Sequence, residues 1–104
     1  MGELENAKIL AAEIEVPQNR PKLDLHGKFL EEGTLNEVDR FLYNCFKNNE
    51  TTAEVVYGIG EGKMQKYVLD FLKMHPLVEE DENGKKSIIE KPGHCIVVLP
   101  EKNT

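Results

Sequence analysis

One predicted helix between two strand-like segments constrains the fold of this chain most strongly. The helix is predicted over residues 33–49, and its apolar side chains fall on one stripe at helical spacing: Leu35, Val38, Phe41, Leu42, Cys45 and Phe46. Thr34 and Glu37 fit the S/T-x-x-E capping box at the helix start. Strand-like segments precede this helix at 22–27 and follow it at 52–60. Two strands joined by one helix normally lie parallel, with a right-handed crossover.

The rest of the pattern completes a small sandwich. A second amphipathic helix is predicted over 62–76, where Pro76 ends a stripe that includes Val68, Leu72 and His75. Asn83-Gly84 is a strong turn signal, and it is followed by strand-like residues 86–90 and 94–99 with a Lys-Pro-Gly turn between them. The order β-α-β-α-β-β predicts a two-layer α/β (α+β) sandwich with a mixed four-stranded sheet and two helices.

Composition limits the classes of protein that fit. A chain of 104 residues is one domain, predicted here as an arm or linker at 1–21, a globular part at 22–100 and a tail at 101–104. No apolar run approaches the ~20 residues of a membrane helix, and the start lacks a secretory pattern, so we expect a cytoplasmic protein without a membrane partner. Cys45 and Cys95 are expected to be reduced and buried, and the Cys and His spacing predicts no zinc site.

Two short motifs carry the candidate chemistry. In Leu-Asp-Leu-His-Gly, residues 23–27, strand alternation points Asp24 and His26 to one face, and Gly27 permits a turn directly afterwards. In the second motif, residues 57–63, three glycines stand between a strand and a helix: Gly58, Gly60 and Gly62. Because both motifs follow parallel strands, they are expected to meet at one edge of the sheet.

This combination suits phosphodiester chemistry. Backbone amides of a glycine-rich turn at a helix N-terminus bind phosphate oxygens, and Lys63 and Lys66 in the first helical turn would add positive charge. His26 would move a proton near neutral pH, with Asp24 either orienting the imidazole or holding a divalent metal ion. No other cofactor is predicted. In RNA the substrate's own 2′-hydroxyl would serve as nucleophile without a metal.

These motifs resemble those of the Smr (small MutS-related) domain family, over roughly residues 22–100. The resemblance implies a fold like the C-terminal domain of translation initiation factor three. It also implies a nicking endonuclease or a nucleic-acid-binding module. Asp24 and His26 match the family's LDxHG pair, and the three glycines match its second, glycine-rich motif. The chain departs from the family's pattern at Tyr57 and Glu61, and its last strand has no Arg.

Two functions therefore remain open at the level of sequence. The first is hydrolysis of phosphodiesters in RNA or in branched or single-stranded DNA, with Asp24 and His26 catalytic. The phosphate and nucleic-acid contacts are then predicted at Gly27, Tyr57, Gly58, Gly60, Gly62, Lys63 and Lys66. The alternative is a non-catalytic module that binds nucleic acid or a protein, which the net charge of −6 favours because it leaves no general basic surface. The acidic arm, 1–21, is the predicted route to a protein partner, and Tyr57 is predicted either to stack on a base or to pack against the helix.

Overall fold

The computed structural model describes residues 20–101, and it has the predicted fold class. Its elements are β1 (Lys22–Asp24), α2 (Glu32–Lys47), β2 (Thr52–Val56), α3 (Lys63–Lys73), β3 (Ile88–Lys91) and β4 (His94–Val98). The sheet has the order β1-β2-β4-β3, with β1 and β2 parallel and the other pairs antiparallel. Most of the predicted arm, 1–21, and of the predicted tail, 101–104, lies outside the described residues.

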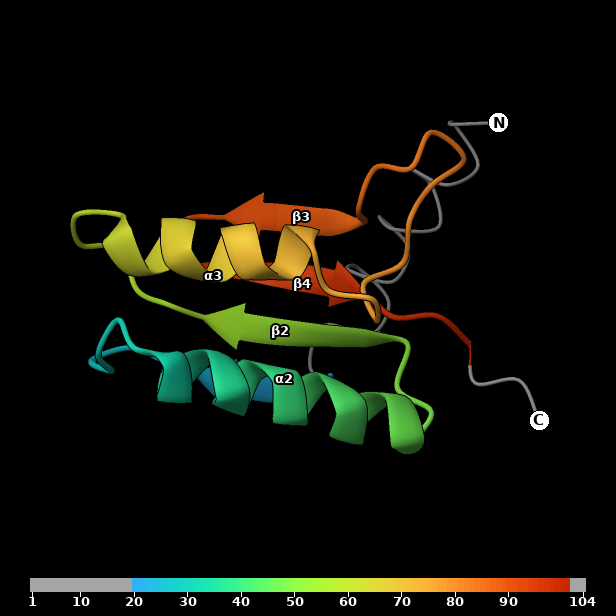
Figure 1. Ribbon diagram of the computed structural model, residues 1–104, viewed down its shortest axis with the longest axis horizontal. Helices are drawn as coiled ribbons and strands as arrows, with labels where there is room; N and C mark the ends of the chain where they lie inside the picture. Colours follow the sequence, from blue (N-terminus) through green and yellow to red (C-terminus); the bar gives the residue numbers. More distant parts are fainter. Residues whose placement is uncertain (1–19, 102–104) are drawn as a thin grey trace.

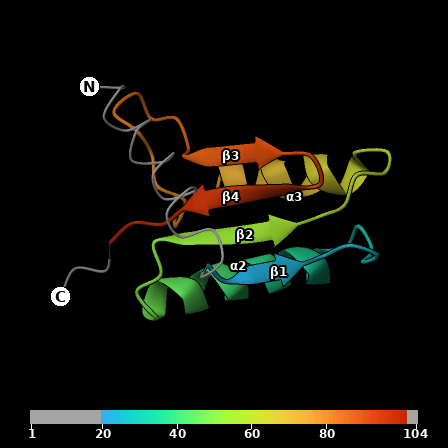
Figure 2. The ribbon, with the colours of Figure 1, turned by 180° about the vertical axis from the view of Figure 1, so that it is seen from behind.

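Both helices lie against the same face of the sheet, as the two opposite views in Figures 1 and 2 show. The predicted stripes face inward: Val38 and Leu42 of α2 and Val68 and Leu72 of α3 are each fully buried. These helix residues belong to one hydrophobic core with strand residues that are paired side by side across the sheet: Leu23, Val55 and Cys95. Burying these side chains supplies the main stabilisation of the sandwich.

The predicted capping box at Thr34 and Glu37 is wrong. The helix α2 begins at Glu32, one residue before its predicted start at 33, with Glu31 as its N-cap residue and no side-chain cap. Thr34 lies inside the first turn, where its buried hydroxyl donates to the Phe29 carbonyl at 2.7 Å. The hydroxyl therefore fixes the approaching loop rather than a helical amide.

The strand β1 ends earlier than its predicted limit at residue 27, because the chain turns at Leu25. The Leu25 amide still reaches the Val56 carbonyl at 2.7 Å, but the Lys28 amide then donates back to the Leu25 carbonyl at 2.9 Å. Gly27 takes φ +85°, a conformation that L side chains rarely adopt. The tight turn leaves His26 exposed at the carboxyl end of the strand.

The end of α3 is tied to α2 through a buried histidine. His75 follows the helix and is 3% exposed, and its Nε2 lies 2.7 Å from Asp39 Oδ1. Its Nδ1 accepts the Leu77 amide at 3.1 Å, so Nε2 carries the proton and donates to Asp39. The ring also makes edge contacts with Tyr43 and Phe71. These contacts orient the two helices that flank the site described below.

Residues 20 and 21 continue the pairing of β1 with β2. The Pro21 carbonyl accepts the Glu54 amide at 2.9 Å, and Arg20 Nε donates to Glu54 Oε1 at 3.3 Å.

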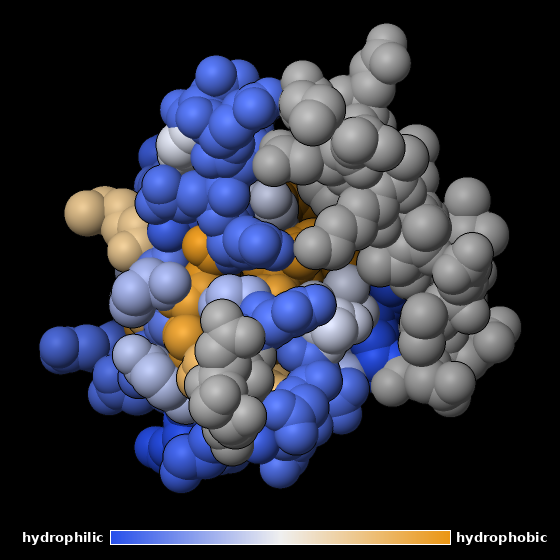
Figure 3. All heavy atoms as spheres, turned by 90° about the vertical axis from the view of Figure 1, so that its right-hand side faces the viewer, coloured by the Kyte–Doolittle hydropathy of each residue, from blue (hydrophilic) through white to orange (hydrophobic). Residues whose placement is uncertain are grey.

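The end of the domain shown in Figure 3 is mainly hydrophilic around an apolar centre, as far as the coloured atoms show. Within the described part, neither helix is long and apolar enough to cross a membrane.

Candidate functional site

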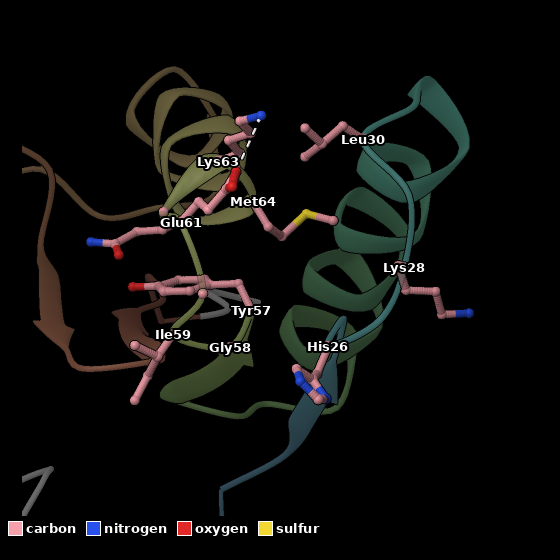
Figure 4. Close-up of a pocket in the computed structure, with 12 residues that line it drawn as sticks. His26, Lys28, Leu30, Tyr57, Gly58, Ile59, Glu61, Lys63 and Met64 are labelled. Carbon is pink, nitrogen blue, oxygen red and sulfur yellow. Dashed lines mark ion pairs between the residues drawn. The ribbon is translucent and has the colours of Figure 1, made fainter.

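The imidazole of His26 lies directly against the glycine loop that follows β2. A Cβ atom on Gly58 would stand only 2.6 Å from His26 Cδ2, so the ring occupies the space that any other side chain at 58 would need. Both residues line a cavity of about 300 Å³ (Figure 4). Parallel pairing of β1 and β2 brings them together, since Asp24 and Val56, the last residues of the two strands, are sheet neighbours.

The loop 57–62 supplies the backbone amides of the cavity. Gly58 and Gly62 have φ of +86° and +82°, and α3 begins directly after Gly62 without a side-chain cap. The Tyr57 and Gly58 amides both donate to the Gly93 carbonyl at 2.9 Å, so the β3–β4 turn holds the start of this loop. Within residues 20–101, the amides from 59 to 65 have no backbone acceptor. These later amides, at the positive end of the helix dipole, are the ones available to an anion.

Asp24 acts on the site through the backbone. Its Oδ1 accepts the His26 amide at 2.8 Å, the two-residue reach of an Asx turn. The carboxylate thereby fixes the turn that presents the imidazole. Among residues 20–101 the ring nitrogens of His26 have no hydrogen-bond partner, which leaves both of them available to a ligand in the cavity.

Tyr57 packs under the loop rather than standing free for a base. The residue is 4% exposed, and its hydroxyl donates to the His94 carbonyl at 2.9 Å. Burial, together with the nearby Cys95 and Glu90, raises the pKa of the Tyr57 phenol well above its usual range. One side of the ring borders the cavity in Figure 4, so Tyr57 forms its floor as an uncharged group.

The lysines around the cavity are already paired with carboxylates. Lys63 Nζ lies 3.3 Å from Glu61 Oε1, and the dashed line in Figure 4 marks this pair. Lys28 lies 3.7 Å from Glu37, and Lys66 forms an i,i+4 pair with Asp70 at 2.9 Å. All of these pairs are largely exposed to solvent, so an incoming phosphate can compete for the ammonium groups. The local positive charge is nevertheless largely neutralised.

The structure brings most of the predicted site residues into one cavity. Its lining includes six of them: His26, Tyr57, Gly58, Gly60, Gly62 and Lys63. Asp24, Gly27 and Lys66 do not line it. Six further lining residues were not among the predicted site residues: Lys28, Leu30, Ile59, Glu61, Met64 and Gln65. Of these, Ile59 and Glu61 lie within the second motif. Lys28 and Leu30 lie within three residues after the LDLHG motif, and this proximity was the only feature of the sequence that pointed to them.

His94, Cys45 and Cys95 do not line this cavity. His94 is in β4, where its Nε2 is 3.7 Å from Glu54 and its Nδ1 is 3.2 Å from the Pro92 carbonyl. Cys45 and Cys95 are free and buried, and burial raises their pKa values to about 11 and about 12. Among residues 20–101, no three His, Cys, Asp or Glu side chains gather as a metal ion would need. The side chains at the site therefore do not fit a resident metal of three protein ligands, and no step below depends on one.

These elements define a small α+β domain with a cavity at the carboxyl edge of its parallel strands, lined by the glycine loop and one imidazole. The family model of the Smr domain matches residues 23–99 of the chain. The chain therefore belongs to the Smr domain family.

Relatives and a solved structure agree with this assignment. The chain is 35% identical over 68 residues to Endonuclease MutS2 of Streptococcus thermophilus, which is 65% of this chain and 9% of that protein. It is 34% identical over 65 residues to Endonuclease MutS2 of Halalkalibacterium halodurans, or 62% of this chain and 8% of that protein. The chain thus spans less than a tenth of the length of these relatives. The crystal structure of the Smr domain of Thermus thermophilus MutS2 has the same fold, with a TM-score of 0.62 at 23% identity over 77% of this chain and 98% of that one.

Proposed function

We propose that this Smr domain hydrolyses phosphodiester bonds in RNA or in structured DNA at the cavity between His26 and the glycine loop. The observation that carries the proposal is the contact of the His26 ring with Gly58 beside a row of amides without backbone acceptors. The relatives named as endonucleases support nucleic acid as the substrate class. A cytoplasmic location remains an expectation from the sequence.

Each group has a definite role in this proposal. Amides from residue 59 onward bind the non-bridging phosphate oxygens and stabilise the charge that grows on them as the bond breaks. His26 takes the proton from the attacking oxygen, which is a water molecule or, in RNA, the adjacent 2′-hydroxyl. The departing oxygen lies opposite the attacking one in an in-line displacement, so it takes its proton from water, and the imidazolium returns its proton to the solvent. Asp24 is a positioning residue, because it touches the His26 backbone and not the reacting atoms.

Cleavage by the full chain tests the proposal. End-labelled single-stranded RNA, single-stranded DNA and a branched DNA are incubated with the protein, with and without Mg²⁺ or Mn²⁺. We expect His26→Ala to slow cleavage at least 100-fold, the usual contribution of a general acid or base. His94→Ala is the matched control, because it removes an imidazole outside the cavity. Equal cleavage by the parent protein and His26→Ala would contradict the proposal.

The paired lysines favour a second candidate, a module that binds nucleic acid without cutting it. Lys28, Lys63 and Lys66 each face a carboxylate, so the positive charge in and beside the cavity is already paired. In this case the parent protein would cut none of the three substrates. It would still bind at least one of them, more weakly as the salt concentration rises.

A further inference from the structure

Exposed apolar side chains lie on the two loops that build the cavity, and two of them, Leu30 and Ile59, line it. In the described part, the large hydrophobic residues most open to solvent are Phe29 (77%), Leu30 (48%), Tyr43 (42%), Ile59 (72%) and Met74 (85%). Three of these belong to the two loops that follow β1 and β2, and we call Phe29, Leu30 and Ile59 the apolar rim. Grouped apolar residues on the surface of a small domain mark a contact site rather than ordinary surface variation.

The cavity itself combines apolar walls with a polar base. Leu30 and Met64 extend into it from the loop after β1 and from α3, and Ile59 stands on the far side beyond Tyr57 (Figure 4). The glycine loop, with its backbone amides, lines the same cavity. A nucleotide could contact both parts of this cavity. Its base offers flat apolar faces to the apolar walls, and its phosphate accepts hydrogen bonds from backbone amides.

The charges around the cavity argue against recognition of a duplex. Binding to double-stranded nucleic acid depends mainly on many cationic contacts with phosphates. Here Lys28 and Lys63 line the cavity, and each is paired with a glutamate. The chain as a whole carries a net charge of −6. Affinity must then come largely from apolar contact with bases, and bases in a duplex are stacked on each other and cannot offer their faces.

We infer that this site takes unpaired nucleotides, with a base against the apolar rim and the neighbouring phosphate on the amides of residues 59–65. The inference rests on the proposed function for the phosphate half of the site. For the half of the site that would hold the base, the inference goes further and names the substrate class. That class is single strands, loops or displaced ends rather than regular duplex. A protein partner is the competing occupant of the apolar rim, and the experiment below separates the two.

The test measures binding by the full chain in a His26→Ala background, which keeps the substrate intact. Fluorescence anisotropy is recorded with a labelled 12-nucleotide RNA, the DNA of the same sequence, and both in duplex form, at one fixed salt concentration. We expect the single strands to bind at least tenfold more tightly than the duplexes. Adding Phe29→Ser and Ile59→Ser should weaken single-strand binding at least tenfold, given the usual contribution of a base contact, and leave duplex binding unchanged.

Met74→Ser is the matched control. Met74 is more exposed than any residue of the rim, and it lies at the other end of α3 as the C-cap residue. Its substitution should leave single-strand binding unchanged. Because all the substituted side chains are exposed, melting temperatures should agree with that of the parent protein.

Several outcomes would overturn the inference, and they differ in whether they also contradict the proposed function. Duplex binding as tight as single-strand binding would end the inference but leave the cleavage proposal intact. Single-strand binding that survives the rim substitutions would do the same, because it would show that the rim makes no contact with the strand. If no polynucleotide is bound and none is cut by the parent protein, the proposed function fails as well.

Discussion

His26 and Gly58 share one small volume, because the imidazole fills the place where a side chain at 58 would begin, 2.6 Å from His26 Cδ2. Gly58→Ala is therefore predicted to push the ring out of the cavity. A catalytic group displaced by about 1 Å can lose a factor of about 100 in rate. We expect Gly58→Ala to cut the cleavage rate at least tenfold, measured on the best of the three substrates.

The control for this change is Gly84→Ala. Gly84 has nearly the same backbone angle, φ +79° against +86°, but its Cβ would meet nothing closer than Glu80 Oε2 at 3.8 Å. Both variants should lose about 1–2 kcal/mol of stability from the strained backbone. Only Gly58→Ala should lose activity. An equal loss of activity in both variants would show that the loss comes from reduced stability and not from displacement of the His26 ring.

Asp24 is predicted to tolerate one substitution and not another. Its Oδ1 accepts the His26 amide at 2.8 Å, and asparagine keeps an oxygen able to accept that bond. Asp24→Asn should retain cleavage within about threefold, whereas Asp24→Ala should lose at least tenfold because the turn is no longer fixed. Substrate KM and kcat measured for both variants distinguish this role from direct chemistry. A large loss in Asp24→Asn would show that the negative charge itself is needed.

The two cysteines predict a loss of stability in alkali. Burial raises the pKa of Cys45 to about 11 and that of Cys95 to about 12, while unfolded thiols ionise near about 8.5. The folded protein then holds protons that the unfolded chain loses, so the free energy of unfolding falls as the pH rises from about 8.5 toward 11–12. At pH ~9.5 Cys95 alone should account for about 1 kcal/mol.

Urea unfolding between about pH 7.5 and 9.5 measures this effect, below the range in which the Tyr57 phenol would ionise in the unfolded chain. The Cys45→Ala, Cys95→Ala double variant should be less stable at neutral pH but lose less of its stability as the pH rises. Identical slopes for both proteins would refute the assignment to the thiols.

His75 is predicted to be structural and neutral in charge. Nδ1 accepts the Leu77 amide and Nε2 donates to Asp39, and the ring is 3% exposed. His75→Ala leaves the Leu77 amide without its acceptor and opens a void beside Phe71, so it should cost about 2–4 kcal/mol. His94→Ala removes a partly exposed imidazole and should cost less than about 1 kcal/mol. Nitrogen-15 shifts of the His75 ring should show the Nε2–H tautomer, and the Nδ1–H tautomer would contradict the bonding described.

Much of the fold could be predicted because its signals are local. Helical stripes such as Val38–Leu42–Cys45 and the glycine turns at 84 and 93 fix the element order, and one helix between β1 and β2 fixes their parallel pairing. The helix start could not be predicted, because the Thr34 hydroxyl is used by the Phe29 carbonyl of the preceding loop. The acceptor that the Thr34 hydroxyl uses depends on the path of that loop in space.

The meeting of the two motifs at the candidate site could be predicted from the sequence, but the individual hydrogen bonds and ion pairs there could not. Adjacent parallel strands bring His26 to the glycine loop, and that convergence follows from topology alone. The use of the Gly58 amide by Gly93 could not be foreseen, since the two residues meet only through the sheet order. The pairing of Lys28 with Glu37 likewise depends on how the loop after β1 meets α2.

Titration of the nitrogen-15-labelled full chain with inorganic phosphate tests the central claim most directly. We predict saturable shifts of the amides of Gly60, Gly62 and Lys63 and of the His26 ring. Only small shifts are expected at Lys85 and Lys86, which line a separate lysine-rich cavity. Shifts confined to those lysines, with the glycine loop and His26 unchanged, would contradict the claim that the loop and the imidazole form one phosphate site.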